Sequence, residues 1–410
     1  MEYEKLRIIS YNDPKEAEKE YENRLNSLTT FKTDLIITPY SVQKEERVVH
    51  ERYSLFYMPL PTILLLEDKI LRHSKKIQEE LKGLPPVAQE KMLFNHIIDE
   101  IQSTNDIEGV RSTRKELREA AKYKDTKTSI RFKGIVSQYL NIGDSKYEKI
   151  KKVEDIRNIY DNLFLDDVEE DEKPDGKLFR KNTVYVKGEH KNVHQGAPNE
   201  ELIIKDLEAL INFMNSKSYP FLLKSAITHY FFEYIHPFYD GNGRLGRFIL
   251  SSYLARKTDK FTGVSFSKAV RDNRKKYLDA FSEVSDPKNK GDITHFVQTI
   301  FEIIIDGQVN TIEKLLEYQA RFNQATQYMK NLDSVSEEEK EIIFYYIQNT
   351  LFDSVSLIED REMMQFIGIT MPTFKKRIQP LIEKNIIFQT KKRPSIHVLS
   401  DQFIERMQDD

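Results

Sequence analysis

The feature that most restricts the fold of this chain is an apolar helix interrupted by a polar, glycine-containing loop. Residues 221–235 carry large apolar side chains on all sides of the predicted helix. A helix that is apolar all round must be buried among other elements. Residues 236–243 break the pattern with one proline and two glycines, and residues 244–256 return to a helical pattern. We therefore expect a mainly helical core around this helix, loop and helix.

The composition agrees with a helix-rich protein and excludes several classes. Gly and Pro are scarce, at 14 each, which excludes collagen-like and disordered chains. The absence of cysteine excludes disulfides and thiolate metal sites and fits a reducing compartment. The N-terminus has no signal-peptide pattern, and no apolar stretch is long enough to cross a bilayer. We expect a cytoplasmic protein without a membrane partner.

The pattern of the chain predicts three regions. Residues 1–75 form an N-terminal arm, 76–310 a helical core and 334–400 a C-terminal domain. Within the core, apolar residues recur with helical period in a helix at about 90–109. Turn-rich clusters bracket a hairpin-like flap at about 183–195.

The second half of the interrupting loop predicts an anion-binding site. Gly241 and Gly243 lack a Cβ, so their N–H groups can approach a ligand closely. These groups lie at the start of a helix, and a helix N-terminus favours anions. Arg244 and Arg247 are three residues apart on the first turn, so both can reach the same phosphates.

The first half of the loop adds a base and a metal ligand. His236 titrates near neutral pH and can accept a hydroxyl proton. Asp240 offers a hard oxygen ligand for Mg²⁺. Taken separately, a His-Pro pair is typical of a capping turn, and Asp-Gly-Asn-Gly is typical of a plain turn. Together these groups indicate phosphoryl or nucleotidyl transfer.

As a whole, residues 236–247 resemble the Fic family signature His-x-Phe-x-(Asp/Glu)-Gly-Asn-Gly-Arg-x-x-Arg, and every fixed position is matched. The similarity extends over about 61–307. Members of this family mostly transfer AMP from ATP to Ser, Thr or Tyr hydroxyls of proteins. The resemblance therefore implies a Fic-type helical core and a protein adenylyltransferase that uses ATP and Mg²⁺, acts on a target protein and modifies itself.

The resemblance also implies roles for individual residues. His236 would be the general base and Asp240 the Mg²⁺ ligand, while Asn242 would assist catalysis in the anion hole. The residues expected to bind the nucleotide are Gly241, Asn242, Gly243, Arg244, Arg247, Tyr277 and Asn289. The last two stand where relatives line the adenine and ribose pocket, although Tyr277 also fits simple core packing.

A short motif at the end of the 90–109 helix resembles the inhibitory motif (Ser/Thr)-x-x-x-Glu-(Gly/Asn) of the family. Thr104, Glu108 and Gly109 match it. Alone, this motif fits equally well an ordinary helix that ends at a glycine. The resemblance implies that Glu108 pairs with Arg247 and occupies the place of the γ-phosphate. We expect auto-inhibition in cis; removal of AMP with help from the same glutamate is an alternative.

The flap resembles the target-docking hairpin of the family, which would hold a target segment as an added strand. Its central residues are Val184, Tyr185 and Val186. An ordinary surface hairpin fits these residues equally well.

Three predicted helices followed by a β-hairpin give residues 334–400 the outline of a winged helix-turn-helix. Such a domain binds DNA, or else serves as a protein-interaction or homodimerisation module. Basic residues on its third helix and wing favour DNA; they are Lys375, Lys376, Arg377, Lys384, Lys391, Lys392 and Arg393. The alternative functions are a DNA-binding regulator with a nucleotide-sensing core, and a transferase of UMP, GMP or phosphocholine.

Overall fold

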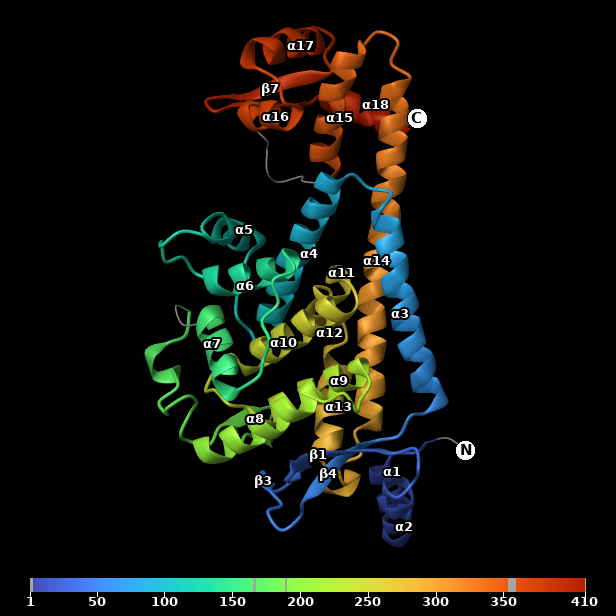
Figure 1. Ribbon diagram of the computed structural model, residues 1–410, viewed down its shortest axis with the longest axis vertical. Helices are drawn as coiled ribbons and strands as arrows, with labels where there is room; N and C mark the ends of the chain where they lie inside the picture. Colours follow the sequence, from blue (N-terminus) through green and yellow to red (C-terminus); the bar gives the residue numbers. More distant parts are fainter. Residues whose placement is uncertain (1–2, 165–166, 189, 353–358, 410) are drawn as a thin grey trace. The chain divides into compact units, whose positions relative to one another are not determined.

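A computed structural model describes residues 3–164, 167–188, 190–352 and 359–409. These residues are mostly helical, and their strands pair only as small two-stranded antiparallel hairpins (Figure 1). The predicted mainly helical class is therefore confirmed, with a hairpin in the flap region and another near the C-terminus. Within the described part of the chain, no helix is both long enough and apolar enough to cross a membrane.

The chain forms two compact units. One contains Met1–Lys75 and Asn95–Val309, and the other contains Lys76–Phe94 and Asn310–Asp410. The N-terminal residues thus pack in the same unit as the loop at 236–247. The domain boundaries expected from sequence remain a prediction.

Among the described residues, the first unit contains eleven complete helices, and its strands form three two-stranded antiparallel pairs. Its helices are α1 (Leu6–Asn12), α2 (Pro14–Leu25), α5 (Arg114–Lys122), α6 (Lys133–Gly143), α7 (Val153–Phe164), α8 (Glu200–Asn215), α9 (Phe221–Ile235), α10 (Asn242–Lys257), α11 (Lys260–Gly263), α12 (Phe266–Asp272) and α13 (Arg274–Ser285), with 3₁₀ turns η1 (Glu170–Glu172) and η2 (Pro287–Asn289). Its strands are β1 (Phe31–Ile37), β2 (Tyr40–Ser41), β3 (Glu46–Arg47), β4 (Tyr53–Tyr57), β5 (Tyr185–Lys187) and β6 (Asn192–Gln195). Helices α3 (Pro61–Leu81), α4 (Pro86–Ile107) and α14 (Thr294–Lys330) contribute residues to both units.

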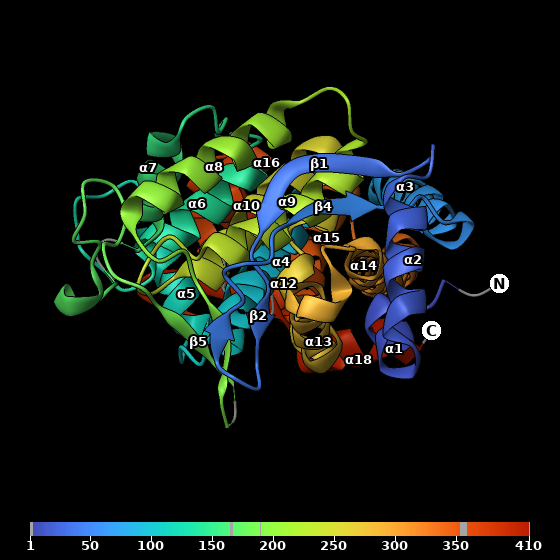
Figure 2. The ribbon, with the colours of Figure 1, turned by 90° about the horizontal axis from the view of Figure 1, so that it is seen from below.

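Helices α9 and α10 form the centre of the first unit, as their apolar pattern predicts. Helix α10 packs against α6, α7, α9, α11 and α12 (Figure 2). Almost every residue of α9 is buried, because its side chains are apolar on all sides. The outer face of this pair is covered by α8, against which β1 packs. The loop between α9 and α10 is consequently held at both ends by buried helices.

The second unit contains the C-terminal elements in the predicted order. These are α15 (Glu337–Phe352), α16 (Asp360–Ile367), α17 (Met371–Glu383), β7 (Ile387–Lys392), β8 (Ser395–Leu399) and α18 (Asp401–Asp409). Strands β7 and β8 pair as an antiparallel hairpin. Helix α17 runs through Pro380, although a proline inside a helix usually kinks or shortens it. The sequence pattern also predicts a helix at 357–367, whose first two residues lie outside the described part.

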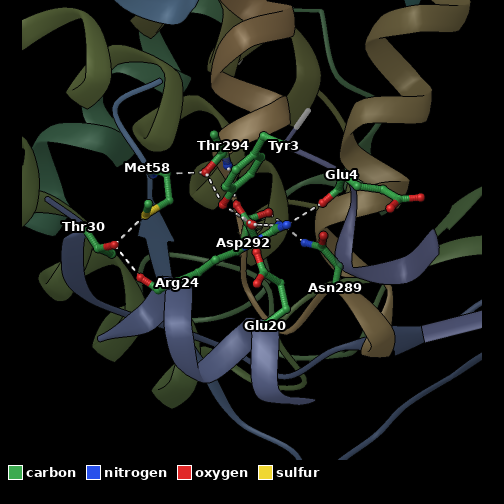
Figure 3. Close-up of polar contacts among 9 residues, drawn as sticks. All are labelled: Tyr3, Glu4, Glu20, Arg24, Thr30, Met58, Asn289, Asp292 and Thr294. Atoms are coloured by element: carbon green, nitrogen blue, oxygen red, sulfur yellow. Dashed lines mark hydrogen bonds and ion pairs between the residues drawn. The ribbon is translucent and has the colours of Figure 1, made fainter. Parts of the chain in front are cut away.

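A buried polar network joins the N-terminal helices to the turn that precedes α14 (Figure 3). The Arg24 guanidinium on α2 donates from Nη1 to Asp292 Oδ2 at 3.2 Å. The Tyr3 hydroxyl donates to the same carboxylate oxygen at 2.6 Å. Both members of the ion pair are almost fully buried, at 4% and 2% side-chain exposure. Because a charge without a partner is costly in the interior, each depends on the other.

We predict that Arg24→Met lowers the free energy of unfolding by about 3–5 kcal/mol, because Asp292 is left as an unpaired buried charge. Denaturant unfolding measures the change. Lys19→Met on the exposed side of the same helix is the matched control, and Arg24→Met with Asp292→Asn should recover part of the loss. An Arg24→Met effect no larger than that of Lys19→Met would contradict the prediction.

Candidate active site

The loop between α9 and α10 is shaped by two residues with positive φ. His236 ends α9 at φ 53° and donates its N–H to the Phe232 carbonyl at 3.0 Å. Gly241, at φ 83°, stands just before α10. Such a conformation suits glycine and strains a residue with a side chain, so His236 is held there by its surroundings.

Two side chains hold the loop from inside. Phe238 is fully buried and stacks on Tyr160, with ring centroids 3.7 Å apart. Asn242 Oδ1 accepts from the Phe238 N–H at 2.9 Å, and its Nδ2 donates to the Phe238 carbonyl at 2.8 Å. The Asn242 side chain thus braces the loop. Its expected part in an anion hole stays a prediction.

The imidazole of His236 is set up as a neutral base. Its Nδ1 lies 3.3 Å from the Glu233 carbonyl oxygen, which can only accept, so the proton belongs on Nδ1. The ring is 19% exposed. Burial lowers the pKa of His236 to about 4. At neutral pH the ring is therefore uncharged, and its Nε2 can accept a proton.

Arg180, which no sequence pattern singled out, holds the backbone at His236 in place. It is completely buried. Its Nε donates to the His236 carbonyl at 2.8 Å and its Nη2 to the Ile235 carbonyl at 3.3 Å. A Cβ on Gly196 would lie 2.5 Å from Arg180 Nη2, so the flap approaches this guanidinium only because that residue is glycine. The flap hairpin was the sequence signal in this region.

Two of the three residues of the proposed inhibitory motif, Thr104 and Glu108, contact Arg247. Arg247 Nε donates to Thr104 Oγ1 at 2.8 Å, and Nη2 donates to Glu108 Oε1 at 2.7 Å and to the Thr104 carbonyl at 3.2 Å. Arg247 and Thr104 are buried. Gly109, at φ 73°, turns the chain after α4. Thr104 on α4 and Glu108 just after it thereby provide acceptors for Nε and Nη2 of Arg247.

The Glu108 carboxylate also lies against the start of α10. A Cβ on Gly243 would be 2.2 Å from Glu108 Oε1, so the missing side chain makes room for the carboxylate. Burial acts to raise the pKa of Glu108, but Arg247 and, more weakly, Arg244 lower it overall. Glu108 is therefore ionised at neutral pH. An acidic side chain thus occupies the helix N-terminus at which the sequence predicts phosphate.

The expected metal ligand and the first loop arginine pair with each other. Arg244 Nη2 donates to Asp240 Oδ2 at 2.6 Å. The Asp240 side chain is 37% exposed and that of Arg244 is 5% exposed. The described residues contain no group of three or more His, Asp or Glu side chains that could hold a metal. A single partly exposed carboxylate fits Mg²⁺ when a nucleotide supplies the other oxygens, since this ion usually binds one or two carboxylates plus phosphates.

The two residues expected at the nucleotide base are both buried. Tyr277 is 3% exposed and its hydroxyl lies 2.7 Å from His229 Nε2. Asn289 is 2% exposed and donates to the Asp292 carbonyl at 2.7 Å, inside the network of Figure 3. Each has a packing role in the structure, and contact with a nucleotide stays a prediction.

The flap is a hairpin of β5 and β6 whose register pairs Tyr185 with Gln195 and Val186 with His194. Tyr185 is 49% exposed. Val184 precedes β5, and its carbonyl accepts from the Gly196 N–H at 3.0 Å. The hairpin is therefore formed as expected, and its use for target docking remains a prediction.

Part of this chain is similar in sequence to known and probable protein adenylyltransferases. The chain is 33% identical over 126 residues to the protein adenylyltransferase Fic of Drosophila ananassae, which is 31% of this chain and 23% of that protein. It is 37% identical over 81 residues to a probable protein adenylyltransferase of Aquifex aeolicus (strain VF5), which is 20% of this chain and 23% of that protein. The matches thus span about a quarter of these relatives.

A solved structure shares the fold. The crystal structure of a Fic family protein from Desulfovibrio desulfuricans G20 superposes with a TM-score of 0.54 at 20% identity, and covers 84% of this chain and 98% of that one. The likeness shows a Fic-like arrangement of helices. Residues 150–254, which include α7 to α9 and nearly all of α10, match the Fic/DOC family model. The chain therefore contains a Fic/DOC family domain.

Proposed function

We propose that this protein transfers AMP from ATP to hydroxyl groups of target proteins and of itself, and that Glu108 restrains the reaction. The observation that carries the proposal is a neutral base, His236, on the same short loop as a glycine-lined helix N-terminus with two arginines. The adenylyltransferase names of the curated relatives support AMP as the group transferred.

In this proposal His236 takes the proton of the attacking hydroxyl at Nε2. The hydroxyl oxygen bonds to the α-phosphorus of ATP, and the bond to the bridging oxygen breaks, so that pyrophosphate leaves. Backbone N–H groups of 241–243 and the guanidinium of Arg244 would stabilise the negative charge on the phosphates. Asp240 would hold Mg²⁺, which neutralises phosphate charge when bound. Arg180 would keep the base in place through the backbone carbonyl of His236.

We predict that His236→Ala abolishes transfer of label from α-labelled ATP, because no other group takes the hydroxyl proton at this position. Mass spectrometry of the purified protein after incubation with Mg²⁺ and ATP should show a gain of one AMP unit in the parent and none in His236→Ala. His50→Ala, at a histidine that is 79% exposed, is the control and keeps full labelling. Labelling with UTP, GTP or CDP-choline but not ATP would instead identify another donor.

The Glu108 contact supports the second half of the proposal. When Glu108 holds Arg247, the guanidinium is unavailable to a terminal phosphate and the carboxylate repels one. A triphosphate could still bind, but with its α-phosphate misaligned for attack. Arginine–carboxylate pairs are strong enough for this role.

We predict that Glu108→Gly raises auto-modification at least tenfold, which corresponds to about 1.4 kcal/mol in the barrier. Asp106→Gly is the control, since it places glycine two residues before Glu108, in the last turn of α4, and removes a carboxylate that faces Arg271. An equal rise in both variants would show that loosening of the helix, rather than loss of the Glu108 charge, causes the effect. An unchanged rate in Glu108→Gly would contradict the proposal that Glu108 restrains the reaction.

We further propose that the C-terminal unit binds duplex DNA as a winged helix-turn-helix. Two of its seven cations are engaged by α15, because Arg377 pairs with Glu338 and Lys384 with Glu339. The other five are exposed and form no ion pair with the described residues; they are Lys375, Lys376, Lys391, Lys392 and Arg393. Their position on α17 and on the β7–β8 hairpin is the observation that favours DNA.

We predict that the full chain binds duplex DNA with an affinity that falls as salt rises. Replacement of Lys375 and Lys376 by alanine should make the slope of log K against log [salt] shallower by about 0.9 for each lost phosphate contact. Lys384→Ala is the control, because this lysine already pairs with Glu339. Binding that does not depend on salt, or no binding, would leave protein interaction as the role of this unit.

A further inference from the structure

One buried carboxylate beside the candidate active site has no part in the proposed reaction. Glu233 lies on the last turn of α9, three residues before His236. Its side chain is 13% exposed, and its Oε2 lies 3.8 Å from His236 Nδ1. Its Oε1 is buried and has no hydrogen-bond partner among the described residues. A buried polar atom without a partner is unusual and calls for an explanation.

The packing of α9 on α10 provides the space for this carboxylate. A Cβ on Gly246 would lie only 2.1 Å from Glu233 Oε1 and 3.1 Å from the Phe232 ring. The carboxylate therefore rests against the backbone of α10 at a position where a side chain would displace it. Glu233 is thus held between the base and the helix that carries Arg247.

Charged and titratable groups face Glu233 from four elements. His236 faces it from the loop, Arg247 from α10, Glu108 from the turn after α4 and Tyr277 from α13. Burial raises the pKa of Glu233 to about 8; Arg247 acts against this rise, and Glu108 adds to it. The protonation of Glu233 near neutral pH therefore depends on whether Glu108 is present on Arg247.

We propose that Glu233 is a positioning residue for His236 and that its charge couples this base to the Glu108–Arg247 contact. The inference rests on the proposed function, and it adds a regulatory link within the same site. An ionised carboxylate near Nδ1 favours the tautomer that leaves Nε2 free, and it stabilises the imidazolium that forms when Nε2 accepts the hydroxyl proton.

The position of Glu108 then determines whether Glu233 is ionised, and through it how strongly His236 attracts a proton. While Glu108 lies on Arg247, its negative charge favours the protonated form of Glu233. When Glu108 departs, Glu233 loses a negative neighbour and keeps a positive one, so its ionised form is favoured. Departure of Glu108 therefore frees Arg247 and strengthens the base in one step.

NMR of the full chain with ¹⁵N-labelled histidine tests the coupling without any turnover. The His236 signal is assigned by its loss in His236→Gln. We expect its ring nitrogens to shift with a midpoint near pH 8 in the parent, and at a lower pH in Glu108→Gly, because removal of a negative neighbour lowers a carboxyl pKa. In Glu233→Gln this shift should be absent. Glu208→Gln, at an exposed carboxylate on α8, is the control and should match the parent.

Transfer rates provide the second readout. In the Glu108→Gly background, Glu233→Gln should lower kcat at least tenfold while the Kd for ATP stays the same, and Glu233→Asp should recover part of the rate. The increase of kcat/KM with pH should disappear in Glu233→Gln, because the ionised carboxylate is the active form.

The two proposals fail in different ways. If Glu233→Gln leaves both the His236 titration and the rate unchanged, Glu233 does not position the base, and AMP transfer still stands. If no variant transfers AMP, the proposed function fails, while the His236 titration still decides whether Glu233 senses Glu108. A higher Kd for ATP or a lower Tm alone, without the loss of the titration, would mark Glu233 as a packing residue and overturn the inference.

Discussion

The organisation of this site depends on the buried guanidinium of Arg247. A cation that is almost completely removed from water needs acceptors around it, and these come from Thr104 on helix α4 and from Glu108 in the turn that follows it. This requirement joins α4 to α10 directly beside the loop that carries His236. It also places the Glu108 carboxylate against the start of α10. The same contact therefore stabilises the fold, and under the proposed function it also restrains the reaction.

The Glu108 carboxylate of that contact stays ionised over the ordinary range of pH. The pKa of Glu108 is lowered, so the ion pair is fully present above the unfolded pKa of a glutamate and is lost only as the pH falls through the lower folded value. Mild acidification would therefore not release Glu108. Release requires a competitor for Arg247 or a movement of α4. Under the proposed coupling, Glu233, whose pKa is raised by burial to about 8, responds to such a change near neutral pH.

Several features could be predicted from the sequence because they are local. The apolar pattern of α9, the two glycines of the loop and the position of α10 follow from side-chain type and spacing alone. The helix at the inhibitory motif and the flap hairpin were also indicated by short patterns. By contrast, α2 has few apolar residues, and its anchoring through Arg24 and Asp292 joins residues 268 apart in sequence. No local pattern carries such information.

By itself, the sequence determined which chemical groups this protein has in its loop and which helices hold that loop. Only the tertiary structure decided their state. Asn242 braces the loop because its amide meets the backbone of Phe238, and Asp240 pairs with Arg244. Arg180 and Glu233 matter because folding brings a guanidinium and a carboxylate to the base. Hydrogen bonds, burial and neighbouring charge determine whether a group can accept a proton, holds the loop in place or pairs with an arginine. These conditions depend on contacts between distant segments.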